Sequence, residues 1–96
     1  MSAEEIVATL RELNGEMERD FKAVVQGIFG SRARGDDRDD SDLDVLVEFR
    51  EKATIYDLVG LGDFLEEKFH CKVDVVSKRA LSEKLKPHIM KELVRV

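Results

Sequence analysis

The sequence predicts a small α/β (α+β) domain in which helices pack on a mixed β-sheet. Segments with apolar residues at helical spacing alternate with short apolar runs rich in β-branched residues. The chain has 96 residues, which is enough for one domain spanning residues 1–96. Its hydrophobic fraction of 43% supports a modest core, while its charged fraction of 39% exceeds the roughly 25% of ordinary globular domains.

The first third of the chain predicts a helix, a strand and a short second helix. Residues 2–5 have the pattern of a capping box, and the helix should run to about Asp20 with apolar residues at Ile6, Leu10, Leu13 and Met17. Residues 22–29 form an apolar run that predicts the first strand. Residues 31–34, directly after Gly30, are expected to form the short helix.

The middle of the chain predicts an acidic loop followed by the second strand. Residues 35–41 are too polar and acidic for a helix or strand, and residues 42–49 read as a strand. Side chains alternate along a strand, so one face should carry Leu43, Val45, Val47 and Phe49. Asp42 and Asp44 should share the opposite face, at the point where the strand begins.

The last part of the chain predicts a capped helix, a third strand and a final helical region. Residues 54–57 can cap a helix that ends near Phe69, and residues 72–76 predict a strand with Asp74 facing away from its apolar neighbours. A helical region should begin near Ala80, be interrupted by Pro87, and end with Ile89, Leu93 and Val96. The short link between the first two strands favours an antiparallel pair, and the helix before the third favours a parallel crossover.

The charge is distributed unevenly along the chain. The net charge is −5, and residues 36–44 contain six aspartates against the single Arg38, whereas residues 77–96 contain six Lys or Arg against two glutamates. The acidic segment suits a cation, and the basic tail suits an anion or is simply a solvated helix face. Cys71 is the only cysteine, so no intrachain disulfide is possible. No signal peptide or apolar run of about 20 residues is visible, so we expect a cytoplasmic protein without membrane contact.

Gly30 and Ser31 form a candidate phosphate-binding turn. Glycine allows phosphate oxygens to approach backbone N–H groups, serine adds a hydroxyl donor, and a helix N-terminus adds a favourable dipole. The sequence contains neither the dinucleotide-binding pattern G-x-G-x-x-G nor the P-loop pattern. Arg32 and Arg34 flank the turn, where they could contact phosphate or pair with the acidic loop, and the sequence leaves both roles open.

Asp42 and Asp44 form a candidate metal site. Carboxylates two residues apart on a strand can converge on one ion or bridge two, and Mg²⁺ takes a few carboxylates together with substrate phosphates and water. Asp74, on the third strand, is the natural third carboxylate. A calcium loop starting at Asp40 is the rival hypothesis, and we reject it because Val45 occupies the position where an EF-hand needs glycine.

These residues resemble the signature of the minimal nucleotidyltransferases, of the DNA polymerase β-type nucleotidyltransferase superfamily. Gly30-Ser31 is followed by ten residues and then Asp42-Leu43-Asp44, and residues 73–77 resemble the strand of the third carboxylate. The resemblance implies a polymerase β-like fold. It implies that Asp42, Asp44 and Asp74 bind two Mg²⁺ ions, with Asp74 also helping to deprotonate the acceptor hydroxyl. It further implies that Gly30 and Ser31 hold the β- and γ-phosphates of ATP, with Arg32 and Arg34 as additional candidates for nucleotide binding.

The resemblance also implies a partner. Minimal members are typically encoded beside a HEPN-domain protein, an RNase toxin that its antitoxin neutralises by transferring AMP from ATP to a toxin tyrosine. Two alternatives are a non-catalytic antitoxin that acts by binding and an adenylyltransferase for small molecules such as aminoglycosides. Direct nucleic-acid binding is not expected, because the sequence lacks a strong basic surface interleaved with aromatic residues.

Overall fold

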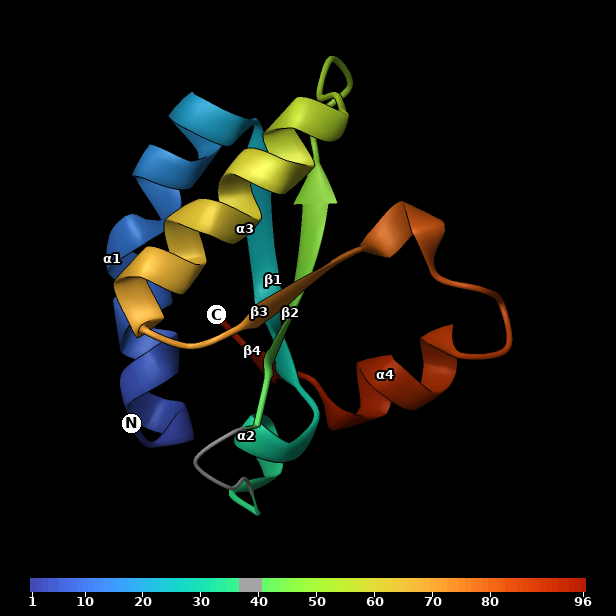
Figure 1. Cartoon of the computed structure of the whole chain (residues 1–96). Helices are drawn as coiled ribbons and strands as arrows, with labels where there is room; N and C mark the ends of the chain where they lie inside the picture. Colours follow the sequence, from blue (N-terminus) through green and yellow to red (C-terminus); the bar gives the residue numbers. More distant parts are fainter. Residues whose placement is uncertain (37–40) are drawn as a thin grey trace.

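Four strands form one mixed sheet with the order β3-β2-β1-β4, as the computed structural model shows for residues 1–36 and 41–96 (Figure 1). β1 is antiparallel to β2 and to β4, whereas β2 and β3 are parallel. The elements in chain order are α1 (Ala3–Phe21), β1 (Ala23–Phe29), α2 (Ser31–Arg34), β2 (Leu43–Phe49), α3 (Ile55–Phe69), β3 (Val73–Ser77), the 3₁₀ helix η1 (Lys78–Ala80), α4 (Lys86–Glu92) and β4 (Val94–Arg95). The predicted fold class and both predicted strand pairings are therefore confirmed.

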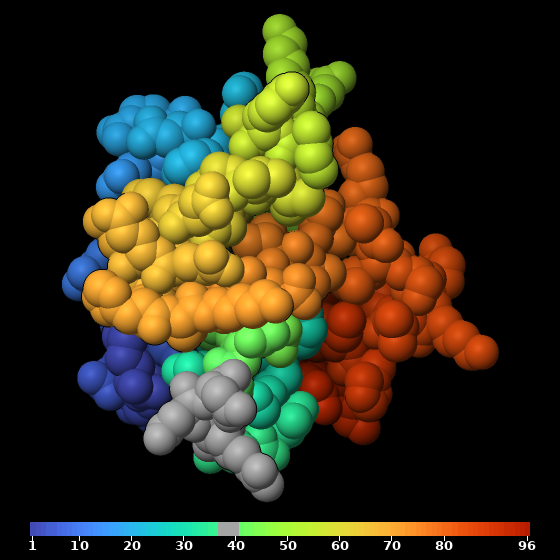
Figure 2. Space-filling model, in the orientation of Figure 1, coloured from blue at the N-terminus to red at the C-terminus, as the bar shows by residue number. Residues whose placement is uncertain are grey.

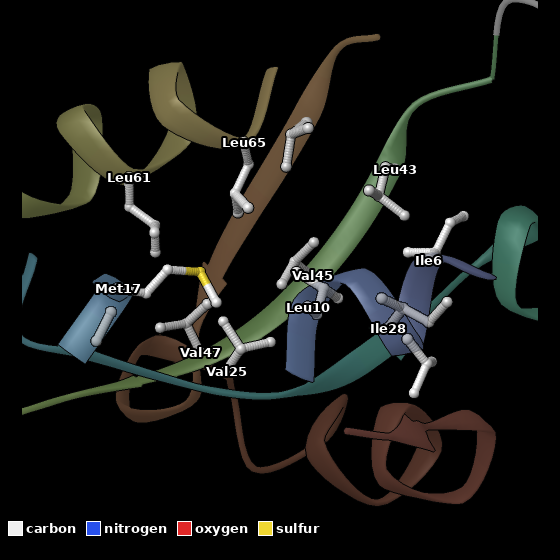
Figure 3. Packing of buried hydrophobic residues seen from close by; sticks show 13 residues of the cluster. Ile6, Leu10, Met17, Val25, Ile28, Leu43, Val45, Val47, Leu61 and Leu65 are labelled. Carbon is white, nitrogen blue, oxygen red and sulfur yellow. The ribbon is translucent and has the colours of Figure 1, made fainter. Parts of the chain in front are cut away.

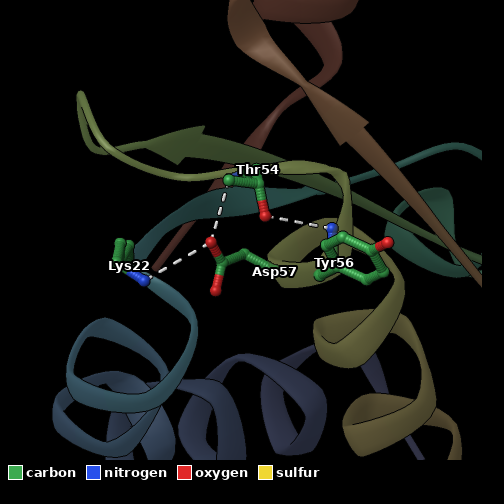
Figure 4. A network of polar contacts seen from close by, with 4 residues as sticks. All are labelled: Lys22, Thr54, Tyr56 and Asp57. Atoms are coloured by element: carbon green, nitrogen blue, oxygen red, sulfur yellow. Dashed lines mark hydrogen bonds and ion pairs between the residues drawn. The ribbon is translucent and has the colours of Figure 1, made fainter.

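Both long helices begin at the capping boxes that the sequence predicts. In α1, the Glu5 N–H donates to Ser2 Oγ at 3.1 Å and the Ser2 N–H donates to Glu5 Oε1 at 3.0 Å. In α3, the Thr54 N–H donates to Asp57 Oδ2 at 2.9 Å (Figure 4). Lys22 Nζ lies 3.5 Å from the same oxygen, so this cap also ties the end of α1 to the start of α3. Lys22 itself is the left-handed C-cap of α1 and not, as predicted, the first residue of the strand.

The hydrophobic core lies between the sheet and the helices α1 and α3 (Figures 1 and 3). Leu43, Val45 and Val47 are fully buried, as the alternation along β2 predicts, and they belong to the same cluster as buried residues of both helices. Leu46 is also fully buried, although it lies on the opposite face of β2 with Asp44. No helix among the described residues is long and apolar enough to cross a membrane.

A β-bulge in β1 shapes the edge on which β4 pairs. The register with β2 shifts between Val25 and Gly27, so Gln26 is the additional residue. Ile28 beyond the bulge is again fully buried. A side chain at Gly27 would collide with the Val94 carbonyl and lie 3.0 Å from Leu93 Cδ1, so glycine is what allows the C-terminal segment to approach β1.

The prediction for the C-terminus is wrong in two respects. The final helical region does not begin near Ala80: η1 ends there and α4 starts only at Lys86, with Pro87 in its first turn, where proline is tolerated. It also does not continue to Val96, because Val94–Arg95 is a strand and the Val96 N–H donates to Gln26 O at 3.1 Å. The free edge of β1 offers backbone partners that an isolated helix end lacks, and valines favour strands.

Candidate active site

The parallel pairing of β2 with β3 places Asp44 beside Asp74. The two residues are register partners, and each is the second residue of its strand. Their side chains therefore leave the same face of the sheet about 5 Å apart. Asp44 is half-buried and Asp74 is exposed, on the edge strand of the sheet. Asp42 is exposed and lies just before β2, one residue outside the strand in which the sequence placed it. The structure therefore brings the second and third predicted carboxylates together, with Asp42 close in sequence.

Gly30 lies directly against the carboxylate of Asp44. Phe29, at the end of β1, is the register partner of Asp44, and Gly30 follows with a φ of +77°. A Cβ at Gly30 would collide with Asp44 Oδ2. Two independent constraints therefore require glycine here: the left-handed side of the backbone map and the close approach of a carboxylate.

The turn after Gly30 exposes backbone donors. The N–H groups of Ala33 and Arg34 both donate to the Gly30 carbonyl at 3.1 Å, and these are the first hydrogen bonds of α2. The N–H groups of Gly30 and Ser31 precede them, so neither has a carbonyl partner within α2. Such donors, with the half-buried Ser31 beside them, are a suitable cradle for phosphate oxygens next to the carboxylates.

The two arginines that flank the turn bind groups of the protein itself. Arg32 donates from Nε and Nη2 to the Ser41 carbonyl at 3.1 and 2.9 Å, which ties the turn to the residue before Asp42. Arg34 pairs with Asp36 at 3.2 Å and with Glu92 of α4 at 3.5 Å. Nucleotide contact by either arginine stays a prediction. The rest of the acidic loop, residues 37–40, which includes Asp40 of the rejected calcium pattern, lies outside the described residues.

The electrostatics of the cluster favour a bound cation. Burial raises the pKa of Asp44 above its ordinary value, the neighbouring charges of Asp74 and Asp42 raise it further, and Arg34 partly offsets them. Among the described residues, no group of three or more His, Cys, Asp or Glu side chains is close enough together to hold a metal ion. Mg²⁺ does not need such a group, because it binds through one or two carboxylates and completes its shell with water and phosphate oxygens. The all-oxygen donor set of Asp42, Asp44 and Asp74 fits this ion.

A separate hollow lies at the opposite end of the β2–β3 pair. Its volume is about 490 Å³, and it is lined by the end of β2, the start of α3, the segment after β3 and the first residue of α4. Sequence reasoning missed it, because its walls come from two segments far apart in the chain. The only signal was the basic run that begins at Lys78, which the sequence explained equally well as a solvated face.

Comparisons with known proteins identify the family of the chain. Residues 10–96 match the model of the nucleotidyltransferase domain family. A protein of Thermococcus cleftensis called protein adenylyltransferase MntA is 32% identical over 96 residues, covering 100% of this chain and 97% of that protein. A solved structure of a minimal nucleotidyltransferase superposes with a TM-score of 0.83 and 38% identity, covering 100% of this chain and 97% of the other.

A more distant structure supports the fold alone. It is a toxin–antitoxin complex with AMP-PNP, and it superposes with a TM-score of 0.69 and 23% identity over 83% of this chain and 66% of that one. The family model matches nearly the whole chain, residues 10–96. The chain is therefore a nucleotidyltransferase, a member of the nucleotidyltransferase domain family.

Proposed function

We propose that this nucleotidyltransferase transfers AMP from ATP, with two Mg²⁺ ions, onto a tyrosine hydroxyl of a partner protein. The partner is a HEPN-domain RNase toxin, and the chain is its antitoxin in the cytoplasm. The observation that carries the proposal is the register of Asp44 with Asp74 directly beside the Gly30 turn. Further support comes from the relative called protein adenylyltransferase MntA and from the toxin–antitoxin neighbour with AMP-PNP.

Each residue of the site has a distinct role in this reaction. The N–H groups at Gly30 and Ser31, with the Ser31 hydroxyl, hold the β- and γ-phosphates. Asp42, Asp44 and Asp74 would hold Mg²⁺, which neutralises charge on the triphosphate and the leaving pyrophosphate when it is bound. Asp74 is exposed on the edge strand, so an acceptor hydroxyl can approach it from outside the sheet and lose its proton to it. The new bond joins the acceptor oxygen to the α-phosphorus, and the bond from that phosphorus to pyrophosphate breaks.

A non-catalytic antitoxin is the second candidate. The hollow at the far end of the sheet is a surface for binding that does not include the carboxylates. A protein that acts only by binding would neutralise its toxin without nucleotide. The two candidates therefore differ in whether neutralisation requires ATP.

The test combines labelled transfer with neutralisation. The chain is incubated with Mg²⁺, α-labelled ATP and the purified HEPN-domain protein encoded beside it, and the RNase activity of that protein is measured in parallel. We expect label on one tyrosine by mass spectrometry, loss of label with Asp74→Asn, and retention with Asp63→Asn, an exposed aspartate on α3 away from the site. Neutralisation that proceeds equally without ATP, or with Asp74→Asn, would support the non-catalytic candidate.

A further inference from the structure

We propose that the hollow at the carboxyl ends of β2 and β3 is the docking site for an acidic segment, with apolar side chains, of the protein that accepts the nucleotide. This inference rests on the proposed function, because it names where the acceptor protein binds. We call the site the basic hollow and define it by six of its lining residues: Phe49, Ile55, Leu58, Lys78, Arg79 and Lys86.

The charge of the basic hollow points to an acidic occupant. Among the described residues, no carboxylate forms an ion pair with Lys78, Arg79 or Lys86. Arg50, at the same rim, is by contrast neutralised by Glu18 at 2.8 Å. Three unpaired cations around one depression, in a chain whose net charge is −5, concentrate positive potential at this end of the molecule.

Apolar surface points to a protein rather than a nucleic acid. The lining of the basic hollow includes Ile55, a large hydrophobic side chain that is 63% exposed, together with the partly buried Phe49 and Leu58. Figure 2 shows the start of α3 in yellow-green next to the orange segment after β3. Clustered apolar side chains with a charged rim are typical of protein interfaces. Glu48 and Glu51 also line the hollow and partly offset its positive charge.

The position of the basic hollow suits an acceptor. Glu48, in its lining, is on the same strand as Asp44 and four residues further along. At about 3.3 Å per residue, the two positions are roughly 13 Å apart. An acceptor protein anchored in the basic hollow can therefore present a side chain of another segment to Asp74 without occupying the phosphate turn.

The test measures affinity for the partner separately from chemistry. Binding of the purified HEPN-domain protein is measured without ATP by calorimetry for the wild type, for Lys78→Glu/Lys86→Glu, and for Ile55→Gln. The matched control is Lys68→Glu/Lys91→Glu, which changes the net charge equally at two exposed lysines that do not line the hollow. Melting temperatures confirm that each variant is folded.

We expect the Lys78→Glu/Lys86→Glu variant to weaken partner binding by about tenfold or more, and the control to change it by less than about twofold. Affinity for ATP alone should be unchanged in both. Wild-type affinity in Lys78→Glu/Lys86→Glu and Ile55→Gln would overturn the proposal. The proposal would also be overturned if these variants kept partner binding but lost binding to a 20-nucleotide RNA. The same holds if they kept partner binding but lost a homodimer that light scattering detects in the wild type. A further outcome separates this proposal from the proposed function. If the wild-type complex transfers no label but the variants still bind the partner more weakly, the proposed function is contradicted and the docking site is supported.

Discussion

The two ends of the parallel pair β2 and β3 carry opposite chemistry. At the amino ends, Asp44 and Asp74 are register partners beside the Gly30 turn, and burial together with repulsion from Asp74 raises the pKa of Asp44. At the carboxyl ends, the basic hollow has three cations without ion-pair partners among the described residues, together with the exposed Ile55. We propose that the acidic end performs the chemistry and the basic end recognises the partner, so that one small sheet carries both functions at electrostatically distinct ends.

We expect the largest effect from Asp74→Asn, because this change removes the carboxylate that we propose receives the acceptor proton. Transfer should fall by about 10²–10⁴-fold, the usual contribution of a positioned general base. Affinity for the partner should remain within about twofold, because the basic hollow is unchanged. Quench-flow transfer rates and calorimetry on the same protein check both numbers. A variant that instead loses partner affinity would show that the two ends are not separate.

Gly30→Ala should give the next largest effect. The new Cβ collides with Asp44 Oδ2 and the backbone has a φ of +77°, so the carboxylate must shift and the turn is strained. We expect a loss of about 1–2 kcal/mol in the free energy of unfolding and a decrease in transfer of about 10²-fold. Urea denaturation and transfer rates measure the two effects. Gly15→Ala is the control, because nothing lies within 4 Å of a Cβ at Gly15. An unaltered transfer rate in Gly30→Ala would contradict the close packing of glycine and carboxylate.

Mg²⁺ with ATP should stabilise the acidic end. Ligands that bind only the folded state raise the melting temperature, and a ligand at about 100 times its Kd contributes about 2.7 kcal/mol. For a domain of this size, we expect a rise of about 10 °C by differential scanning fluorimetry, which EDTA should remove. Lys78→Glu/Lys86→Glu should show the same rise. A rise that persists with EDTA would indicate that the carboxylates do not hold the metal.

The smallest effect is expected on the stability of the protein without Mg²⁺ and ATP, when Asp44 is replaced. Burial, Asp74 and Asp42 raise the pKa of Asp44 in the folded state above its unfolded value of about 3.8. The folded state then binds the proton more tightly, so this group lowers stability as pH rises through the interval between the two pKa values. Asp44→Asn removes the penalty at neutral pH. Because solvent screens this half-exposed group, the gain should be about 0.5 kcal/mol, or roughly 2–4 °C in melting temperature. At a pH below the unfolded pKa, the gain should vanish.

The sequence predicts the acidic end well, because its signals are local. The capping residues of α1, the alternation along β2 and the Asp-x-Asp pattern all involve positions a few residues apart. The side-by-side placement of Asp44 and Asp74 follows from one parallel crossover. The contact between Gly30 and Asp44 could not be read from the sequence, where glycine indicated only that phosphate can approach. It depends on how β1 and β2 align across the intervening loop.

At both ends of the sheet, the sequence predicts poorly the features that long-range packing determines. Val94–Arg95 becomes a strand because β1 has a free edge and Gly27 has no side chain there, and neither fact is visible near residue 94. The basic hollow combines the start of α3 with residues that follow β3, so no window of sequence contains it. The hydrogen bonds from Arg32 to the Ser41 carbonyl could not be predicted for the same reason. They join the two sides of a loop whose path the sequence does not specify.

The most direct test that the acidic end is the active site compares two acidic residues on one face of one strand. AMP transfer to the partner is measured for Asp44→Asn and for Glu48→Gln, which lie four residues apart on β2. We expect Asp44→Asn to lower transfer by about 10³-fold, because it removes a carboxylate that we propose holds the metal, while Glu48→Gln should retain at least about half of the wild-type transfer. Wild-type transfer by Asp44→Asn would contradict the assignment of the acidic end as the active site.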